Sequence, residues 1–517
     1  MGLVDLLYIE IQRGRKQEML SVSEIKRFID NDATSEKKTL AGIGQKYYEA
    51  EHDILNCRFF YFNSDGVLVE DKARANFKIS HPFFTELSDQ LSSYMLSFNQ
   101  NPIRAKEKAE GLQEHLDLYF DAEFWAEIGD LISGAYNKGF DYIYGYKNAK
   151  GRLAFRYADG MGVVEVRAKD TDDQCEYIIY WYVDRIDKGK KVIKRIQVWS
   201  EKETYYYVQI GSAGRIQLDD TVELNPRPHI VRKDTTTGQK KGSGLGFIPF
   251  WRLDNNRKQF SGLKPIKSLI DDYDMIQCGL SNNLMDFDTP LYVVSGFEGD
   301  NLDELQQNLK TKKIVGVDSE GDINVKTVDI PYQARQAKAD ADEKNIYRFG
   351  MGLNTAGLKD TSATTNLAIK AAYALLDMKA NKMETRLKKL LKDILEVVLA
   401  EINTTNKTEF QLSDIEFDFT RSTMTNETEN LANKKTEAET KQLEVNTILN
   451  VAANVGDEQT LKAICEVMDW NFEELKDQIE KLNEEGSTAT AQTALDNIVT
   501  DETTTPEKDI VVKGFMG

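Results

Sequence analysis

"IPFWRLDNNRKQFSGLKPIKSLIDDYD", residues Ile248–Asp274, joins three kinds of local structure within one short stretch. Ile248 to Trp251 is apolar, and a short apolar run of this kind is typical of a buried strand. The stretch from Arg252 to Gln259 is polar and predicts a solvated turn. From Ser261 a pattern of helical period begins and continues to about Phe287, which gives a helix roughly 37 Å long at about 1.5 Å per residue. We therefore expect a long helix to follow a strand here.

One face of this expected helix is apolar along its whole length. Its members recur at spacings of three and four residues and are Leu263, Ile266, Ile270, Tyr273, Ile276, Leu280 and Leu284. Ser261 is expected to cap the helix, and Pro265 falls in the first turn, where its missing N–H costs little. Because one subunit cannot cover so long an apolar face, we expect neighbouring copies to cover it.

The chain before this segment predicts an α+β domain. Ser21 and Glu24 form the pattern of a capping box for a first helix. Ser80 is expected to cap a second helix, and residues 122–139 form a third. The second helix has an apolar face made of Phe84, Leu87, Leu91 and Tyr94. The runs 175–184, 190–200 and 203–210 are rich in aromatic and β-branched residues, which predicts an antiparallel meander with one solvated side.

The chain after the long helix predicts a small insert between two helices. The insert spans Thr289 to Val328 and is expected to contain a strand, a helix and a hairpin. Leu302, Leu305 and Leu309 lie on one face of its helix and should pack that helix on the hairpin. Pro331 opens the next helix, 332–349, which must run antiparallel to the first if the insert is compact.

A Gly-rich and hydroxyl-rich loop, Gly350–Asn366, follows and leads into a very long helix from about Leu367 to Ile402. The glycines Gly350, Gly352 and Gly357 suggest a loop with unusual backbone freedom. Between residues 370 and 392 the long helix has seven basic and two acidic residues. This run is either a solvated helix face or a contact with nucleic acid or with an acidic neighbour, and its candidates are Lys370, Lys379, Lys382 and Arg386.

The charge of the chain is strongly negative and uneven. The formal net charge is −19, and residues 401–517 contribute 10 basic and 25 acidic side chains, a net of −15. Such a surface repels a phosphate backbone, so charge alone argues against a protein that grips DNA. The four cysteines lie far apart and fit neither a disulfide framework nor a zinc site.

No catalytic motif is present in the sequence. The four histidines lack metal-ligand spacing and are expected to be structural or solvated. Glu416 and Asp418 share one face of an expected strand, where two carboxylates could bind a divalent metal but a solvated strand face is the simpler interpretation. The sequence therefore predicts no catalytic residue, no cofactor and no metal. It also has no apolar stretch of about 18 residues, so no membrane partner is expected.

The order of these elements resembles the portal proteins of tailed bacteriophages, of the siphophage type that infects Gram-positive hosts. The resemblance covers roughly Ser21 to Asn483, and its segments are "KISHPFFTELSDQLSSYMLSFNQNPI", "ISGAYNKGFDYIYGYKNAKGRLAFRYAD", the opening segment and "LLDMKANKMETRLKKLLKDIL". Many relatives carry a Ser-Gly pair where the long helix begins, whereas this chain has "DTSATTNLAIK".

The resemblance implies a multidomain portal architecture. Its expected parts are the wing (residues 1–260), first stem helix (261–288), clip (289–330), second stem helix (331–349), tunnel loop (350–366), long wing helix and strand (367–422), helical crown (423–485) and disordered acidic tail (486–517). The tunnel-loop residues would be Leu353, Asn354, Thr355, Lys359 and Asp360, and the stem residues Leu263, Ile266, Ile270 and Tyr273.

The same resemblance implies a non-enzymatic ring, a dodecamer, at one vertex of the capsid. Double-stranded DNA would pass through it without sequence-specific binding. The implied protein partners are the large terminase subunit, the scaffolding and major capsid proteins and a head-completion adaptor. The location would be the virion, with the host cytoplasm during assembly. An acidic channel suits this role because many Lys or Arg contacts with phosphates would hold DNA in place.

Two other hypotheses remain open from the sequence. The chain could be a different minor head or connector protein, which would lack the helix–insert–helix–loop–long-helix order. It could instead be a nuclease that uses Glu416 and Asp418 with a divalent metal.

Overall fold

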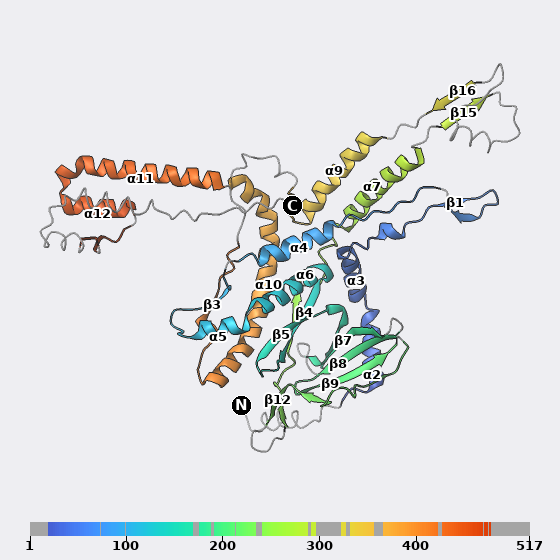
Figure 1. Cartoon of the computed structure of the whole chain (residues 1–517), viewed down its shortest axis with the longest axis horizontal. Coiled ribbons are helices and arrows are strands. Elements are labelled where there is room, and N and C mark those ends of the chain that lie inside the picture. Colours follow the sequence, from blue (N-terminus) through green and yellow to red (C-terminus); the bar gives the residue numbers. More distant parts are fainter. Residues whose placement is uncertain are drawn as a thin grey trace, which may run out of the picture. The chain divides into compact units, whose positions relative to one another are not determined.

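The computed structural model describes residues 19–72, 74–98, 100–168, 175–187, 191–211, 213–233, 240–287, 291–295, 322–326, 331–355, 366–421, 427–468, 470–473 and 475–476. Helices and small antiparallel sheets make up this part of the chain, which confirms the α+β class (Figure 1). The chain divides into two compact units, Met1–Ser362 with Leu367–Thr423, and Ala363–Asn366 with Met424–Gly517. Across the described ranges no helix is long and apolar enough to cross a bilayer.

The first unit contains a three-stranded antiparallel sheet in the order β14-β4-β5. Its strands are β4 (Phe140–Lys147), β5 (Leu153–Ala158) and β14 (Phe250–Asp254), and helix α6 (Ala122–Lys138) packs on them. Of the apolar run Ile248–Trp251, which the sequence predicted to be a strand, Phe250 and Trp251 lie in β14, whereas Ile248 and Pro249 precede it. That strand extends past Trp251 to Asp254, however, because Leu253 is buried and the ladder with β4 continues to Phe140. The polar turn is therefore shorter than the sequence predicted.

The predicted meander is confirmed as part of a second antiparallel sheet. Neighbouring strands follow the order β10-β9-β8-β7-β6, and β11 also pairs with β9. The strands are β6 (Val163–Arg167), β7 (Cys175–Asp187), β8 (Lys191–Trp199), β9 (Glu203–Ile210), β10 (Ile216–Leu218) and β11 (Arg227–Pro228). Helix α2 (Val22–Ala33) begins with the predicted capping box of Ser21 and Glu24, and it buries Ile25 and Ile29 against this sheet.

The largest apolar core lies among the helices of the first unit. It joins α4 (Phe83–Met95), α6 and the long helix α10 (Asn366–Asn406), and it includes residues of α5 (Leu112–Tyr119) and Tyr47 of α3 (Glu36–Tyr48). The predicted apolar face of α4 is buried in this core. The helix begins at Phe83 after Pro82, so the prediction of Ser80 as its cap is wrong. Residues 77–81 instead donate backbone N–H groups to α7.

Helix α7 (Lys267–Phe287) ends where the sequence predicted but begins later. The Ser261 hydroxyl accepts a hydrogen bond from the backbone N–H of Leu263 at 3.0 Å, yet residues 262–266 form turns rather than regular helix. Gly262 explains this local geometry: its N–H donates to the Tyr136 carbonyl, and a Cβ there would lie 2.2 Å from the Tyr136 ring. The chain must therefore cross α6 at close range before the helix can start.

Helix α9 (Tyr332–Phe349) packs against α7, as Figure 1 shows. Its bounds match the sequence prediction. Lys338 binds Asp272, and an Arg335 nitrogen lies 3.5 Å from the Cβ position of Gly279, so the two helices run antiparallel as predicted. Beyond them, strands β15 (Leu291–Ser295) and β16 (Asp322–Lys326) pair antiparallel. The predicted insert helix with Leu302, Leu305 and Leu309 lies outside the described residues.

The described part of the first unit also contains three further strand pairs. The pairs are β1 (Phe60–Phe62) with β2 (Leu68–Glu70), β12 (Ile230–Lys233) with β13 (Lys240–Ser243), and β3 (Ile103–Ala105) with β17 (Ile415–Phe417), all antiparallel. Strand β17 is the strand that the sequence predicted around Glu416 and Asp418, although Asp418 lies just after its end. Its pairing with β3 ties the chain after α10 back to the segment after α4.

The second unit contains two described helices, α11 (Glu427–Val455) and α12 (Asp457–Met468). They pack on one another, and Gly456 joins them with a φ of +94°, a conformation that glycine adopts without steric cost. Ile464 and Cys465 of α12 are buried. The unit resumes at Met424, next to the boundary expected at residue 423.

Candidate functional site

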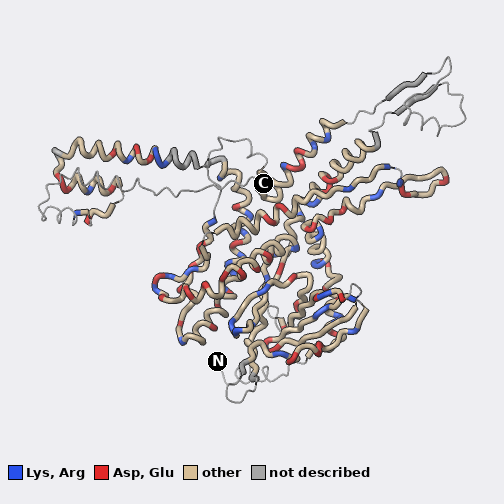
Figure 2. Tube along the Cα trace, viewed as in Figure 1, with Lys and Arg blue, Asp and Glu red and all other residues tan. Residues whose placement is uncertain are grey.

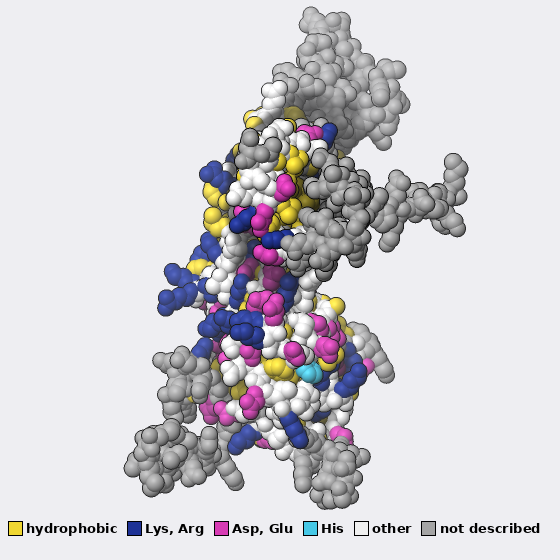
Figure 3. Space-filling model, turned by 90° about the vertical axis from the view of Figure 1, so that its left-hand side faces the viewer, with side chains coloured by type: hydrophobic (Ala, Val, Ile, Leu, Met, Phe, Trp, Pro, Cys, Tyr) yellow, Lys and Arg dark blue, Asp and Glu magenta, His cyan; other side chains and the backbone are white. Residues whose placement is uncertain are grey.

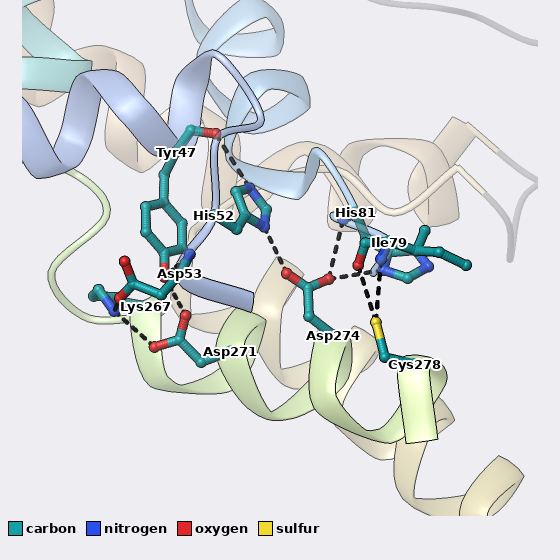
Figure 4. Close-up of polar contacts among 9 residues, drawn as sticks. All are labelled: Tyr47, His52, Asp53, Ile79, His81, Lys267, Asp271, Asp274 and Cys278. Carbon is teal, nitrogen blue, oxygen red and sulfur yellow. Dashed lines mark hydrogen bonds and ion pairs between the residues drawn. The ribbon is translucent and has the colours of Figure 1, made fainter. Parts of the chain in front are cut away.

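One polar face of α7 binds the extended segment of residues 77–81 (Figure 4). Side chains four residues apart on the helix accept hydrogen bonds from backbone N–H groups two residues apart on the segment. The pairs are Asp274 Oδ1 with His81 N at 3.0 Å, Cys278 Sγ with Ile79 N at 3.2 Å and Asn282 Oδ1 with Phe77 N at 2.6 Å. The repeats match because four helical residues rise about 6 Å and two extended residues about 6.6 Å.

Asp274 is the centre of this contact and is fully buried. Its carboxylate is 2.6 Å from Nδ1 of His52 and 2.7 Å from Nδ1 of His81, and each of these nitrogens must donate because an ionised carboxylate only accepts. Burial acts to raise the pKa of Asp274, but the hydrogen bonds from the two histidines outweigh it and the pKa is lowered. The other nitrogen of His52 lies 3.3 Å from the carbonyl of Tyr47. The cluster therefore fixes α7 to two separate segments of the chain, one at His52 and one at His81.

A second polar group lies earlier on α7, with Asp271 about one turn and Lys267 about two turns before Asp274. Lys267 Nζ is 2.6 Å from Asp53 and 2.8 Å from Asp271, and the Tyr47 hydroxyl donates to Asp271. Burial, and then the hydrogen bond to Asp271, raises the pKa of Tyr47. Both groups lie at the junction of α7 with residues 47–81, which is the site that the structure defines most clearly. We call this junction, Lys267 to Asn282 with its partners in residues 47–81, the helix root.

Sequence reasoning missed the helix root because it treated the histidines as isolated. His52 and Asp274 are 222 residues apart in the chain. A usable signal was present on the helix: polar residues recur every three or four positions opposite the apolar face, at Lys267, Asp271, Asp274, Cys278 and Asn282. Such a second stripe indicates a polar partner along that side.

The predicted stem residues pack against their own subunit, whereas the sequence analysis expected neighbouring subunits to cover them. Leu263, Ile266 and Ile270 are buried in the core of their own subunit, and the ring of Tyr273 packs edge-on against Phe83 with 4.9 Å between centroids. The prediction that neighbours must cover this face is therefore wrong for these residues. Among the side chains of α7 that the structure describes, up to residue 285, the large apolar ones that are exposed are Met275, Leu284 and Met285.

The start of the loop after α9 is packed and not open. The backbone of Leu353 exchanges two hydrogen bonds with the Gln90 side chain, at 3.0 and 2.9 Å, and Leu353 is buried in the core. A Cβ on Gly350 or Gly352 would lie 2.6 or 2.0 Å from the Leu87 side chain. These two glycines serve close packing, and neither has a positive φ, so the expectation of backbone freedom is wrong for both. Gly357 lies outside the described residues.

The remaining predicted loop residues are placed in part. Asn354 donates to Glu343 at 3.2 Å, and Thr355 is exposed. Lys359 and Asp360 lie outside the described residues. The structure thus places Leu353 in the core, which removes it from any collar that lines a channel.

Lys379 is the clearest departure among the basic residues of α10. Its ammonium group is buried and donates to the carbonyl oxygens of Leu87 at 3.2 Å and Gly350 at 3.1 Å. Burial lowers the pKa of Lys379 to about 7. This side chain cannot reach DNA or a neighbouring subunit, so its assignment as a surface contact is wrong. Lys370 and Lys382 are exposed, and Arg386 is half-buried.

The carboxylates proposed for metal-dependent chemistry do not form a site. Glu416 is exposed on β17, and Asp418 lies 3.1 Å from Arg104 of β3. The hydrogen bond from Thr420, together with Arg104, lowers the pKa of Asp418. Among the described residues no three His, Cys, Asp or Glu side chains are grouped to hold a metal ion.

Comparison with known proteins gives concordant results. A family model described as "Phage portal protein, SPP1 Gp6-like" matches residues 27–491. The chain is 24% identical over 388 residues to the portal protein of Bacillus phage SPP1, which covers 75% of each chain. It is 23% identical over 435 residues to the portal protein of Clostridium phage phiCD119, which covers 79% of this chain and 88% of the relative.

Proposed function

The chain belongs to the SPP1 Gp6-like family of phage portal proteins, and we propose that its α7–α9 pair is the stem of the portal channel. It serves as a portal protein, with the capsid and packaging roles typical of the family. Such proteins are structural components of the virion and form oligomeric rings. The observation that carries the stem assignment is the helix root, because its buried Asp274 fixes α7 to two wing segments.

A stem that guides DNA has to pass mechanical force to the wing while its orientation at the helix root stays fixed. The helix root suits this task, since its hydrogen bonds follow α7 from Lys267 to Asn282. Breaking the hydrogen bonds of a buried carboxylate costs free energy, because the charge is left without partners. The contact therefore keeps one geometry. We assign residues 289–330 to a clip that docks the large terminase subunit and later the head-completion adaptor. The ring would be a dodecamer that also contacts scaffolding and major capsid proteins.

The charge distribution suits a channel that lets DNA slide. Basic and acidic residues both occur along the described elements of the first unit (Figure 2), and the face in Figure 3 shows both signs. Each Lys or Arg that neutralises a phosphate adds affinity through counterion release, and the net charge of −19 opposes such binding. We assign the loop from Asn354 to Asn366, with Thr355, Lys359 and Asp360, to the narrow part of the channel. Lys370, Lys382 and Arg386 would contact neighbouring subunits.

Electron microscopy and light scattering of the purified protein test this proposal. We expect rings with a central channel, and a particle mass that is a multiple of the 58.8 kDa chain. A stable monomer at micromolar concentration would contradict it. Replacing residues 289–328 with a short Gly/Ser linker should preserve rings but abolish stimulation of the terminase ATPase, and unchanged stimulation would refute the clip assignment.

Deletion of residues 355–361 tests the loop separately. Because the cut lies after the Leu353 contact with Gln90, the core should remain folded. We expect intact rings and procapsids with reduced packaging or retention of DNA. Normal packaging in this variant would remove the loop from the channel.

A further inference from the structure

A cavity of about 150 Å³ lies between the two larger antiparallel sheets of the first unit. Residues of β4 and β5 line it from the three-stranded sheet, and residues of β8, β9 and β11 line it from the sheet that contains the meander. Cavities of about 150 Å³ hold molecules as large as benzene, so this one is large enough for a small ligand. None of its lining residues belongs to α7 or α9, so the cavity is separate from the helix root.

The strand registers place two arginines on the surfaces that face each other across this cavity. Arg156 pairs with Tyr144 in the β4–β5 ladder, so these side chains share one face of their sheet. That face meets the other sheet, because the rings of Tyr144 and Trp199 lie 5.7 Å apart between centroids. Arg227 pairs with Thr204 in the β11–β9 ladder, and both residues line the cavity. One sheet therefore contributes Arg156 and the other contributes Arg227.

The charged side chains of the lining have one sign. Among the described residues that line the cavity, Lys147, Arg156 and Arg227 are basic and none is acidic. The whole chain has 66 basic and 85 acidic residues, so composition alone would not give a lining of this sign. Lys147 pairs with Glu401 at 2.5 Å, whereas neither arginine forms an ion pair within the described ranges. The two guanidinium groups are thus the charges that a ligand could neutralise.

One carboxylate outside the lining acts on Arg156 but already has a partner of its own. Glu127 influences Arg156 electrostatically, and its carboxylate accepts the backbone N–H of Tyr157 at 2.6 Å. Two guanidinium groups that face one small space repel each other more strongly than in bulk water, because the effective dielectric constant there is lower. An anion between Arg156 and Arg227 would replace this repulsion with attraction to both.

Neutral hydrogen-bond donors complete the lining. Burial raises the pKa of Tyr144 to about 12 and also raises the pKa of Tyr206, so both hydroxyl groups keep their protons at neutral pH. His229 adds no charge, because burial lowers its pKa to about 4. The Arg156 guanidinium lies 5.5 Å from the centroid of the Tyr146 ring, a contact that orients its planar group. The arrangement thus presents N–H and O–H donors to acceptor oxygens.

We propose that this cavity binds a compact oxyanion of the phosphate class between Arg156 and Arg227, with hydrogen bonds from Tyr144 and Tyr206. Guanidinium groups bind phosphate through two parallel N–H···O bonds. The four oxygens of phosphate point in different directions and can accept from both sheets at once, whereas the two oxygens of a carboxylate lie in one plane. The bound anion ties the two sheets together and stabilises the folded subunit.

A larger neighbouring cavity, of about 880 Å³, is a poorer place for this ligand. It shares Arg227 and three other lining residues with the smaller cavity, so the two adjoin. Its lining also includes Glu396 and Glu401, whose carboxylates repel an anion. Arg156 lines the smaller cavity alone of the two, and the oxyanion is therefore expected on that side.

Calorimetric titration of the full chain with inorganic phosphate tests the proposal. The ionic strength is held constant with chloride, so that general screening of surface charges does not change during the titration. We expect saturable binding of one phosphate per chain. The double variant Arg156→Gln with Arg227→Gln should bind phosphate at least about tenfold more weakly, because both forked donors are lost. Both arginines are exposed, so the variant should fold, and thermal unfolding in chloride alone checks this.

Two further variants separate a binding role from loss of charge or of structure. Arg185→Gln is the matched control, because Arg185 is an exposed arginine on β7 of the same sheet and does not line the cavity. It should bind phosphate as the parent does. Arg227→Lys keeps the positive charge but not the fork, and it should bind more weakly than the parent and more tightly than the double variant.

A second titration, with short duplex DNA, distinguishes free phosphate from the phosphates of a DNA backbone. Phosphate binding that the double variant loses supports the proposal, whether or not DNA also binds. Absence of saturable phosphate binding, equal affinity in the parent and the double variant, or binding of DNA without binding of phosphate would each overturn it. Because the cavity lies apart from α7 and α9, such a result leaves the stem assignment unchanged.

Discussion

Asp274 on α7 and Lys379 on α10 are both buried ionisable residues, but their surroundings differ in kind. Asp274 is held by two histidine rings and a backbone N–H, and its pKa is lowered. Lys379 has two carbonyl oxygens as hydrogen-bond partners, and burial lowers its pKa to about 7. The environment therefore favours the charged form of the acid and the neutral form of the lysine. The contact made by Asp274 is therefore permanent, whereas the contact made by Lys379 depends on pH.

The largest effect is expected from Asp274→Ala. Removing one partner of a buried charged cluster typically costs about 3–5 kcal/mol, because the buried His52 loses its acceptor. Denaturant unfolding should show this loss of stability. The control is Asp272→Asn on the same helix, which breaks an exposed pair with Lys338 and should cost at most about 1 kcal/mol. Equal losses in the two variants would show that burial does not matter here.

Lys379→Met tests whether the contribution of Lys379 to stability depends on pH. The folded-state pKa of about 7 lies below the usual value of 10.5, so the unfolded chain binds more protons between these limits. Stability of the parent should then rise as the pH increases above 7, by up to about 1.4 kcal/mol per pH unit, and remain constant below it. The variant should lack this slope, because it has no amine to titrate.

The measurement is the difference in unfolding free energy between parent and Lys379→Met from pH 6 to pH 9. Lys382→Met provides the control, because Lys382 is exposed on the same helix. A difference that stays constant across this range would show that Lys379 keeps its proton in the folded state. Lys379 would then not differ from Asp274 in its dependence on pH.

The two sites also show what the sequence could and could not reveal. The long helices and the meander were predictable because their periods of 3.6 and 2 are carried by neighbouring residues. The helix root was not, since the partners of Asp274 come from residues about 200 positions away. Lys379 was read as part of a basic run. Its spacing placed it among apolar residues, however, three positions after buried Leu376 and four before buried Met383.

The glycine-rich composition of the loop after α9 led to the wrong prediction of backbone freedom for a related reason. Glycine permits both backbone freedom and close packing, and the sequence alone does not say which one is used. At Gly350 and Gly352 it is close packing against Leu87. Whether a position is crowded depends on a helix more than 250 residues earlier, and no local pattern reports that.

Gly352→Ala should give an intermediate effect near the Lys379 site. An added Cβ would lie 2.0 Å from a Leu87 methyl carbon, so the side chain or the loop must move. Overpacking of this kind costs about 1–3 kcal/mol. Gly279→Ala is the control, because its Cβ would meet the Arg335 side chain at an ordinary 3.5 Å and alanine favours a helix by about 1 kcal/mol. A stable Gly352→Ala protein would mean that the loop start is loosely packed.

The smallest effect is expected at the far end of the helix root, where Asn282→Ala removes two hydrogen bonds with the backbone of Phe77. Asn282 itself is buried, but Phe77 is 52% exposed, so water can replace the lost partner on the segment side. The loss should therefore be about 1 kcal/mol, well below that for Asp274→Ala. Met275→Ala, at an exposed position of the same helix, is the control and should change subunit stability by less than about 0.5 kcal/mol. If Asn282→Ala costs as much as Asp274→Ala, the polar stripe acts as one cooperative unit, and the contact between α7 and residues 47–81 is not concentrated at the buried carboxylate.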